Sequence, residues 1–430
     1  MIYAADLVYA DGRLYEDAGV AVDDGRITGL SERPSGPGVV RLSGRALVPG
    51  TVNAHNHSFQ SLLRGFGDDL SFLEWRERAL YRYSPRLGVD GVYTGALLAF
   101  GEMLLHGVTT VCDFFYLNDG GNDNARAVVR AARDLGIRLV LARCFYDWEG
   151  APAAYSETPA DAQKRFLELR EELRGDTQVS VQPAPHSLHG ASEAMIRAGA
   201  EVAAESGLPL HIHVAEERYQ VDDALKRYGA RPLFALDRMG ALGARTVCVH
   251  GCWFDESERA LLAERGGALA YNPNSNMFLG DGVTDIVDLF RRGVRIALGT
   301  DGGCSNSRVS VFDEMRACAL LQKVTRLDGR AIDAETCFGF GTRGGGEVLE
   351  LPVGRIAPGY AADLVALDLE DLSLLPLQSF CKNVVYALSA RAIADVIVAG
   401  RRVVADRELC LLPVGAIRER VRQLTRDWTR

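Results

Sequence analysis

The chain has 430 residues, enough for a barrel of roughly 250 residues and a second, smaller domain. Its hydrophobic content of 47% and charged content of 24% are typical of a globular protein. The formal net charge of -9 gives no electrostatic basis for binding nucleic acid or an anionic membrane surface. There is no apolar run of membrane-spanning length and no secretory signal, and the nine cysteines contain no C-x-x-C pair. We therefore expect a cytoplasmic protein with reduced thiols, whose partner is a small molecule.

Both ends of the chain carry short strand patterns. Asp-Gly pairs at 11–12 and 24–25 predict hairpins near the start, and strands recur at 362–367 and 396–404. Two β-rich ends around a different middle predict one discontinuous domain. The expected divisions are the N-terminal part of a β-sandwich at 1–48, a barrel at 49–354, and the C-terminal part of the sandwich with a terminal helix at 355–430.

The middle of the chain alternates apolar strands with amphipathic helices. This alternation predicts parallel βαβ units, and eight of them favour a closed (β/α)8 TIM-like barrel over an open sheet. Residues 58–95 form a long first loop rich in aromatic side chains, which we expect to cover the barrel mouth. The predicted strands are 47–54, 108–113, 136–143, 177–183, 208–214, 245–250, 267–271 and 293–299. The fold class is therefore α/β.

Histidines gather where these strands should end. His55 and His57 stand two apart on a strand, so both side chains project from one face. The pair alone is a weak signal, because two buried histidines bonded to backbone would look the same. Seven of the chain's eight histidines nevertheless fall near strand ends on one rim, where barrel enzymes place their chemistry. If these histidines were only buried core residues, their common position at strand ends would require several independent coincidences.

Imidazoles with one carboxylate and an open position suit a catalytic zinc or iron ion. His211 lies about 6–7 Å deeper than His213 at a rise of roughly 3.3 Å per residue, so it is expected to be an interior histidine. His106 precedes the second strand, at the opposite end of the barrel, and is expected to be structural. The predicted metal ligands are His55, His57, His213 and Asp301.

Six motifs together resemble the amidohydrolase superfamily: NAHNHSFQSLLRG, GVTTVCDF, HIHVAEE, NPNSNMFLGDGV, LGTDGG and GRIAPGYAADLVALD. The resemblance is to the aminohydrolase branch, with its guanine, 8-oxoguanine and adenosine-derivative deaminases, chlorotriazine hydrolases and N-formimino-glutamate deiminases. It implies a barrel beside a β-sandwich made from both termini, and one divalent metal ion. Binuclear relatives usually carry a carboxylated lysine at strand four, and residues 177–189 contain none. Zinc is the expected ion, with iron or manganese as alternatives, and such look-alike proteins are commonly homodimers.

The predicted mechanism is hydrolytic. A bound metal ion lowers the pKa of its water from about 15.7 towards 7. His250 is placed to bond that water and Asp301 to accept its proton. The family resemblance implies that Glu216 protonates a substrate nitrogen. The alternative interpretation is that Glu216 is only a solvated carboxylate of the loop, which is what we expect of its neighbour Glu217. Water then attacks an sp² carbon bearing nitrogen, and ammonia leaves.

The local likeness is greatest to N-formimino-glutamate deiminases, so an N-formimino amino acid is the first expected substrate. That family's substrate contacts match Gln60, Arg76, Tyr116 and His186. His189 stands where those enzymes carry an arginine that clamps a carboxylate, and imidazole cannot reproduce its bidentate fork. His189 is therefore either a different substrate contact or a surface loop residue.

Other functions stay open. The aromatic first loop and the Asn-Pro-Asn-Ser-Asn segment at 272–276 resemble purine and pterin deaminases such as 8-oxoguanine deaminase. A triazine or cyclic amide hydrolase would keep the same metal site and differ only in its product. A non-enzymatic barrel would be expected to have lost a ligand, and none is lost.

Overall fold

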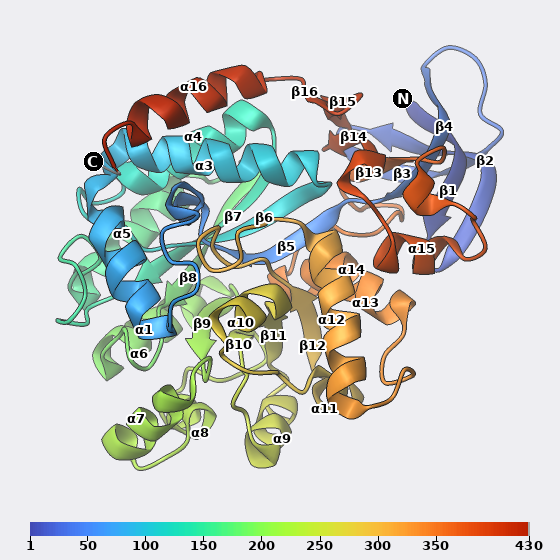
Figure 1. The fold of residues 1–430 in the computed structure, drawn as a ribbon. Helices are drawn as coiled ribbons and strands as arrows, with labels where there is room; N and C mark the ends of the chain where they lie inside the picture. Colours follow the sequence, from blue (N-terminus) through green and yellow to red (C-terminus); the bar gives the residue numbers. More distant parts are fainter. Residues whose placement is uncertain (429–430) are drawn as a thin grey trace.

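The computed structural model describes residues 1–428. Eight parallel strands form the barrel, in two four-stranded sheets ordered β5-β6-β7-β8 and β9-β10-β11-β12. A parallel bridge between Ser187 and His213 joins the sheets on one side. On the other side the backbone nitrogen of Asp301 donates to the carbonyl of His55 at 3.0 Å. The predicted (β/α)8 barrel is confirmed (Figure 1). Its strands are β5 (Thr51–Asn56), β6 (Val108–Phe115), β7 (Arg138–Phe145), β8 (Val179–Pro185), β9 (Leu210–Val214), β10 (Thr246–His250), β11 (Ala268–Tyr271) and β12 (Arg295–Leu298).

The barrel strands are apolar because both of their faces are covered. Every residue of β6 and β7 is buried, as expected for parallel strands enclosed by helices. The prediction for the first strand, 47–54, is wrong in one respect: it joins the end of β4 (Val39–Pro49) to β5 across Gly50. A Cβ at Gly50 would lie 2.2 Å from Thr109 Oγ1, so glycine allows the close passage between the two parts of the fold.

Helices surround the barrel, and no helix within residues 1–428 is long and apolar enough to cross a membrane. The predicted loop 58–95 is a series of short helical turns, and its last part already belongs to α3. These turns are η1 (Ser58–Leu63), α1 (Phe72–Trp75), the π-helical η2 (Arg76–Leu80), α2 (Tyr81–Tyr83) and η3 (Ser84–Arg86). The other helices are α3 (Gly88–Leu105), α4 (Asp123–Leu135), α5 (Pro159–Glu172), α6 (Glu193–Ser206), α7 (Arg218–Tyr228), α8 (Pro232–Arg238), α9 (Glu256–Glu264), α10 (Pro273–Leu279), α11 (Ile286–Arg291), α12 (Val311–Arg326), α13 (Ala334–Gly341), α14 (Arg343–Leu349), η4 (Leu372–Leu374), α15 (Phe380–Tyr386), η5 (Ala390–Ala392) and α16 (Val414–Thr425).

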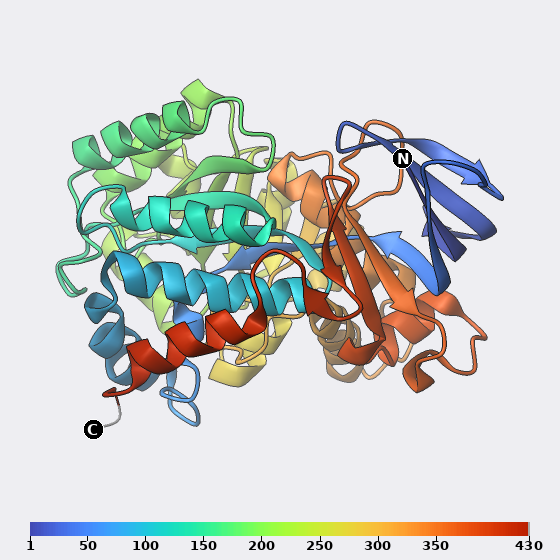
Figure 2. The same ribbon diagram turned by 90° about the horizontal axis from the view of Figure 1, so that it is seen from above.

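The two ends of the chain form a second sheet beside the barrel, as predicted (Figure 2). Its eight strands follow the order β16-β15-β14-β13-β4-β1-β2-β3, so the C-terminal strand β13 pairs directly with the N-terminal strand β4. The sheet encloses an apolar core of its own, with contributions from Tyr3, Val20, Leu364 and Ile397. The strands are β1 (Ile2–Ala10), β2 (Arg13–Asp23), β3 (Arg26–Glu32), β4, β13 (Leu364–Asp368), β14 (Ile393–Val398), β15 (Arg401–Ala405) and β16 (Glu408–Leu409).

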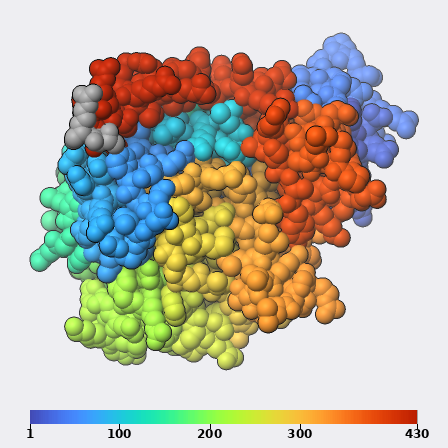
Figure 3. All heavy atoms as spheres, viewed as in Figure 1, coloured from blue at the N-terminus to red at the C-terminus, as the bar shows by residue number. Residues whose placement is uncertain are grey.

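The last helix, α16, leaves the terminal sheet and runs along the barrel helix α3 (Figures 1 and 3). A Cβ at Gly101 of α3 would lie 2.9 Å from Ile417 Cδ1 of α16, which shows how closely the two helices approach. Arg420 of α16 also pairs with Asp90 at the start of α3. The C-terminal segment thus ties the terminal sheet to the barrel.

A buried ion pair joins the two parts of the fold and gives a stability prediction. Arg138 on β7 donates from Nε to Asp363 Oδ2 at 2.9 Å and from Nη2 to Oδ1 at 3.1 Å, next to β13. Replacing Asp363 with alanine would leave the Arg138 charge buried without its partner. We expect the free energy of unfolding in urea to fall by about 3–5 kcal/mol.

The matched control is Arg355→Ala, because Arg355 pairs with Asp11 at 3.0 Å on the surface. Exposed pairs contribute about 0–1 kcal/mol, so this variant should unfold almost like the wild type. Equal effects of the two substitutions would show that the buried pair does not hold the two parts together.

Candidate metal centre

The candidate site lies at the carboxyl ends of the barrel strands. β5 carries His55, and His57 follows its last residue. His213 lies on β9, His250 ends β10, and Asp301 follows β12. All five side chains are buried. Parallel strands bring these separate positions to one rim, as the sequence predicted.

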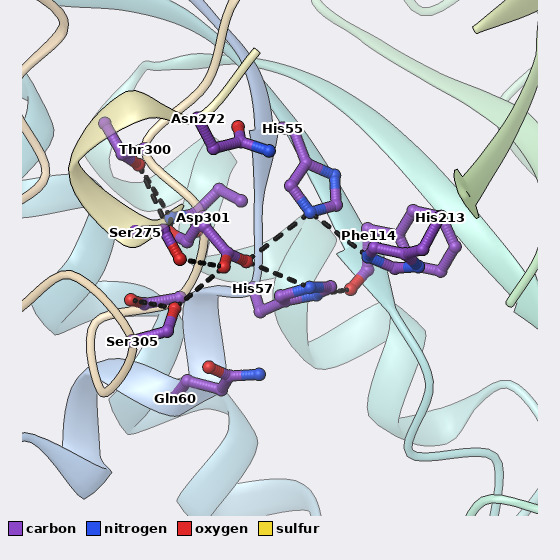
Figure 4. A network of polar contacts seen from close by, with 12 residues as sticks. His55, His57, Gln60, Phe114, His213, Asn272, Ser275, Thr300, Asp301 and Ser305 are labelled. Atoms are coloured by element: carbon purple, nitrogen blue, oxygen red, sulfur yellow. Dashed lines mark hydrogen bonds and ion pairs between the residues drawn. The ribbon is translucent and has the colours of Figure 1, made fainter. Parts of the chain in front are cut away.

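Three imidazoles and one carboxylate lie together there (Figure 4). His55, His57 and His213 form one group of possible metal ligands, whereas Asp301 belongs to a second group, with Glu216 and His250. His55 Nε2 lies 3.2 Å from His213 Nε2. Asp301 Oδ1 lies 3.5 Å from His55 Nε2 and 3.3 Å from His57 Nε2. Donors held 2.0–2.1 Å from a tetrahedral zinc stand about 3.4 Å apart, so these spacings fit one divalent ion. The residues and their geometry therefore suit a divalent metal ion.

Backbone carbonyls fix the tautomers of two of these imidazoles. His57 Nδ1 lies 2.6 Å from the carbonyl oxygen of Phe114, and His213 Nδ1 lies 2.8 Å from that of His186. A carbonyl oxygen only accepts, so each Nδ1 carries the proton and each Nε2 keeps a free lone pair. Burial lowers the pKa of His55 to about 3 and also lowers the pKa of His57 and His213. The imidazoles are neutral, as metal ligands must be.

Asp301 is held with one oxygen towards the imidazoles. Its Oδ2 accepts hydrogen bonds from Ser275 Oγ at 2.6 Å and Ser305 Oγ at 2.8 Å. Burial raises its pKa, but the hydrogen bond with His55 and the electrostatic interactions with His57 and His250 outweigh burial, so its pKa lies well below the usual range. Its backbone has a φ of +58°, an uncommon conformation for a residue other than glycine. Such strain is frequent at functional sites.

A second group of titratable side chains lies beside the first. His250 Nε2 stands 3.4 Å from Glu216 Oε1. The Asn276 amide nitrogen lies 2.9 Å from His250 Nδ1 and 3.0 Å from Asp281 Oδ2. An amide nitrogen donates, so His250 Nδ1 accepts and the His250 proton resides on Nε2, facing Glu216.

Glu216 is a buried carboxyl group whose surroundings favour the protonated form. Burial raises the pKa of Glu216 well above its usual range, and the charges of Asp281 and Asp301 raise it further. Its neighbour Glu217 is half-buried and bonds to Asp281, so the expectation that Glu217 is a solvated loop carboxylate is wrong. Glu217 faces inwards because the chain enters α7 directly behind it.

A cavity of about 50 Å³ opens onto these groups. All five predicted substrate contacts line it, together with a wall of aromatic rings. The ring-bearing residues on the early turns, Phe72, Trp75 and Tyr81, come from the segment that was expected to cover the mouth. Tyr146 and Tyr155 follow β7 and carried no sequence signal. The lining is His57, Gln60, Phe72, Trp75, Arg76, Leu80, Tyr81, Tyr116, Tyr146, Tyr155, His186, His189, His213, Glu216, His250 and Asp301.

Gln60 connects the first loop of the barrel to the last. Its Nε2 donates to Tyr116 Oη at 2.6 Å, and its Oε1 accepts from Cys304 Sγ at 3.2 Å. Trp75 Nε1 also donates to the Cys304 carbonyl at 2.9 Å. A Cβ at Gly302 would lie 1.8 Å from Gln60 Oε1, so only glycine fits there. These contacts fix the orientation of the amide inside the cavity.

Arg76 and His189 flank the cavity. The Arg76 guanidinium lies 5.2 Å from the ring centroid of Tyr81 and 5.1 Å from that of Trp148. It also pairs with Glu77 at 2.9 Å. Burial lowers the pKa of His189 to about 3, so its imidazole is neutral. His189 is partly exposed and lines the cavity, so it remains a candidate substrate contact.

Two histidines lie outside the site. His211 Nε2 bonds to Gln182 Oε1 at 2.6 Å, and the Gln182 amide donates to the carbonyl of Leu349. His211 is thus a buried interior residue, as its depth on the strand predicted. His106 Nδ1 lies 2.8 Å from the carbonyl of Glu102 at the end of α3. Neither ring belongs to the metal-ligating groups.

The sequence did not identify the side chains that orient the site. Ser275 and Ser305 hold Asp301, and Asn276 holds His250. Ser275 and Asn276 belong to the Asn-Pro-Asn-Ser-Asn segment, which stood out only as part of a family motif. Their roles depend on contacts with residues 26 positions away in sequence, which spacing does not encode.

The chain belongs to the amidohydrolase family, whose sequence pattern matches residues 46–403. The family, the fold and the enzyme class, a hydrolase acting on C–N bonds, are thereby confirmed. The chain is 34% identical over 97% of its length to a 5-methylthioadenosine/S-adenosylhomocysteine deaminase of Syntrophobacter fumaroxidans, covering 94% of that protein. It is 35% identical over 91% of its length to a 5'-deoxyadenosine deaminase of Methanothermobacter thermautotrophicus, covering 90% of it.

Solved structures show the same fold. An adenosine deaminase from Xanthomonas campestris with bound zinc has a TM-score of 0.93 and 31% identity, covering 100% of this chain and 98% of that one. An atrazine chlorohydrolase from Arthrobacter aurescens, in complex with zinc, has a TM-score of 0.92 at 22% identity, covering 98% and 99%. The second similarity concerns the fold alone.

Proposed function

We propose that this chain is a mononuclear metal-dependent deaminase, which hydrolyses the amidine-type C–N bond of a small molecule. One observation supports the proposal: three neutral imidazoles, with Asp301 beside them, adjoin a cavity that is also lined by Glu216, a buried carboxyl group whose pKa is raised. Deamination needs both features, because water must be activated while the substrate nitrogen is protonated.

His55, His57, His213 and Asp301 would hold the ion, for which we propose zinc. A divalent ion there acts as a Lewis acid and lowers the pKa of water, so that hydroxide is available at neutral pH. Asp301 accepts the proton of the attacking water and His250 donates from Nε2 towards the oxygen. Glu216 protonates the imine nitrogen of the substrate. The proton on Asp301 then passes to the amino group, which leaves as ammonia. The carbonyl forms as the hydroxyl proton passes to the Glu216 carboxylate, which restores its protonated form.

For the substrate we propose an aminopurine, free or as a nucleoside. Its 6-amino group and adjacent ring nitrogen form the amidine that the site would attack, and the tyrosine-lined walls suit a planar ring. Relatives at 34% and 35% identity are named as deaminases of adenosine derivatives. The cavity of about 50 Å³ is smaller than usual ligand pockets, so a nucleoside requires the turns at 72–81 to move outwards.

An N-formimino amino acid is the second candidate. The observation in its favour is the guanidinium of Arg76 at the cavity wall, which could bind a carboxylate. His189 supplies no second cation, since its imidazole is neutral.

The test is ammonia release by zinc-loaded protein from a panel of compounds. The panel contains adenosine, 5'-methylthioadenosine, adenine, guanine, 8-oxoguanine, a pterin, N-formimino-glutamate and atrazine. We expect ammonia from the aminopurine compounds, in equal amount to the substrate consumed. Release of chloride or of a ring-opened product without ammonia would contradict deamination. Ammonia from N-formimino-glutamate alone would show that the substrate is an N-formimino amino acid and not an aminopurine.

A further inference from the structure

Glu314 is a buried carboxyl group near the start of α12 whose side chain faces the segments that follow β11 and β12, and burial raises its pKa to about 8. It is 1% exposed. Its Oε2 accepts from the backbone nitrogen of Asn274 at 3.1 Å, and its Oε1 accepts from Asn274 Nδ2 at 2.9 Å and Asn306 Nδ2 at 2.7 Å. These donors are neutral amides, one from the first turn of α10 and one from the loop after β12. Glu314 therefore joins the start of α10, which follows β11, to the loop after β12.

Each asparagine stands next to a serine that holds Asp301. Asn274 precedes Ser275 and Asn306 follows Ser305. The two serine hydroxyls both donate to Asp301 Oδ2, from opposite loops (Figure 4). Two adjacent Asn and Ser pairs thus connect Glu314 on one side to Asp301 on the other.

This arrangement determines which oxygen of Asp301 faces the imidazoles. Two hydroxyls occupy Oδ2, so Oδ1 is the oxygen near His55 and His57. Asn306 Nδ2 also donates to the carbonyl of Thr300 at 2.8 Å, directly before Asp301. A shift of either loop would turn the Asp301 carboxylate away from the imidazoles.

We propose that Glu314 is a positioning residue for the deamination reaction, which sets the orientation of Asp301 through Asn274 with Ser275 and Asn306 with Ser305. It touches neither the substrate nor the cavity. The activity part of this proposal rests on the proposed function, whereas the orientation of Asp301 towards a metal ion does not.

The competing explanation is that Glu314 only stabilises the fold. Glu258 on α9 is a matched control, because it is 0% exposed and accepts from Leu233 N at 3.0 Å and Arg231 Nε at 2.9 Å. It does not line the cavity or join the loops around Asp301. In Glu314→Gln and in Glu258→Gln, an NH2 group that donates replaces one carboxyl oxygen that accepts hydrogen bonds in the buried side chain. Both substitutions should therefore lower the melting temperature.

The experiment compares the two variants in zinc-loaded protein. For Glu314→Gln we expect kcat to fall by about 10–100-fold at a KM within about twofold of the wild type, and zinc to be lost faster to a chelator. Glu258→Gln should keep the wild-type kcat and zinc retention. Wild-type kcat and zinc retention in Glu314→Gln, with a lowered melting temperature, would overturn the proposal and leave a stabilising role.

A second comparison tests the route through the serines. In the Ser275→Ala, Ser305→Ala background the connection is already broken, so adding Glu314→Gln should change kcat and zinc loss by less than about threefold. If Glu314→Gln lowers kcat in this background by the same factor as in the wild type, Glu314 does not act through the two serines, and the proposed connection is wrong. If no compound releases ammonia, the zinc-loss measurements still decide the positioning role, and only the proposed function fails.

Discussion

Replacing Glu216 with glutamine is expected to lower kcat for ammonia release by about 10²–10⁴-fold, with the zinc content unchanged. Glutamine keeps the size of the side chain but has no proton to donate to the imine nitrogen. Glu216 could also bind a metal ion, together with His250 and Asp301. Our proposal assigns the ion to His55, His57, His213 and Asp301, so metal binding should persist. Single-turnover kinetics and metal analysis on the same preparation measure both quantities.

The control is His106→Asn, since His106 bonds to its own helix end away from the site. This variant should keep the wild-type kcat, and equal loss in both variants would discredit the assignment of the site. The pH profile gives an independent check. Burial raises the pKa of Glu216, and the reaction needs its protonated form, so kcat should fall as the pH rises through that pKa. Glu216→Gln should remove this decline.

Asp301→Asn is expected to have the largest effect, a loss of kcat of about 10⁴-fold or more. The amide can still bond to Ser275 and Ser305, so the fold around it should remain. It cannot accept the proton of the attacking water, and it is a weaker metal ligand than a carboxylate. Zinc content and kcat should therefore both fall.

Adding excess zinc separates the two losses. Saturating zinc should restore the metal content of Asp301→Asn without restoring kcat, because the missing proton acceptor remains missing. Recovery of kcat to within about tenfold of the wild type would show that Asp301 acts as a ligand only and not as the base.

The barrel was predictable because its strands are buried on both faces and therefore appear as continuous apolar runs. The rim residues followed from this, since parallel strands end on the same side. The turns between residues 58 and 87 were not predictable, because each spans only three to six residues and tertiary contacts decide its form. The break at Gly50 likewise depends on Thr109, far away in sequence.

Within the site, the sequence predicted the ligating types but not what orients them. The proton positions on His57 and His213 depend on the carbonyls of Phe114 and His186, which belong to other strands or loops. The positive φ values of His250, +73°, and Asp301, +58°, carry no sequence signature because neither residue is glycine. Such features arise only when the strands are assembled.

The central claim is that side chains between positions 55 and 301 converge on a single cation that the reaction requires. Titrating metal-free protein with zinc while measuring ammonia release tests it directly. We predict that activity rises linearly and stops rising at one zinc per chain. Activity that is undiminished in metal-free protein, or that continues to rise to two zinc ions per chain, would contradict the mononuclear site.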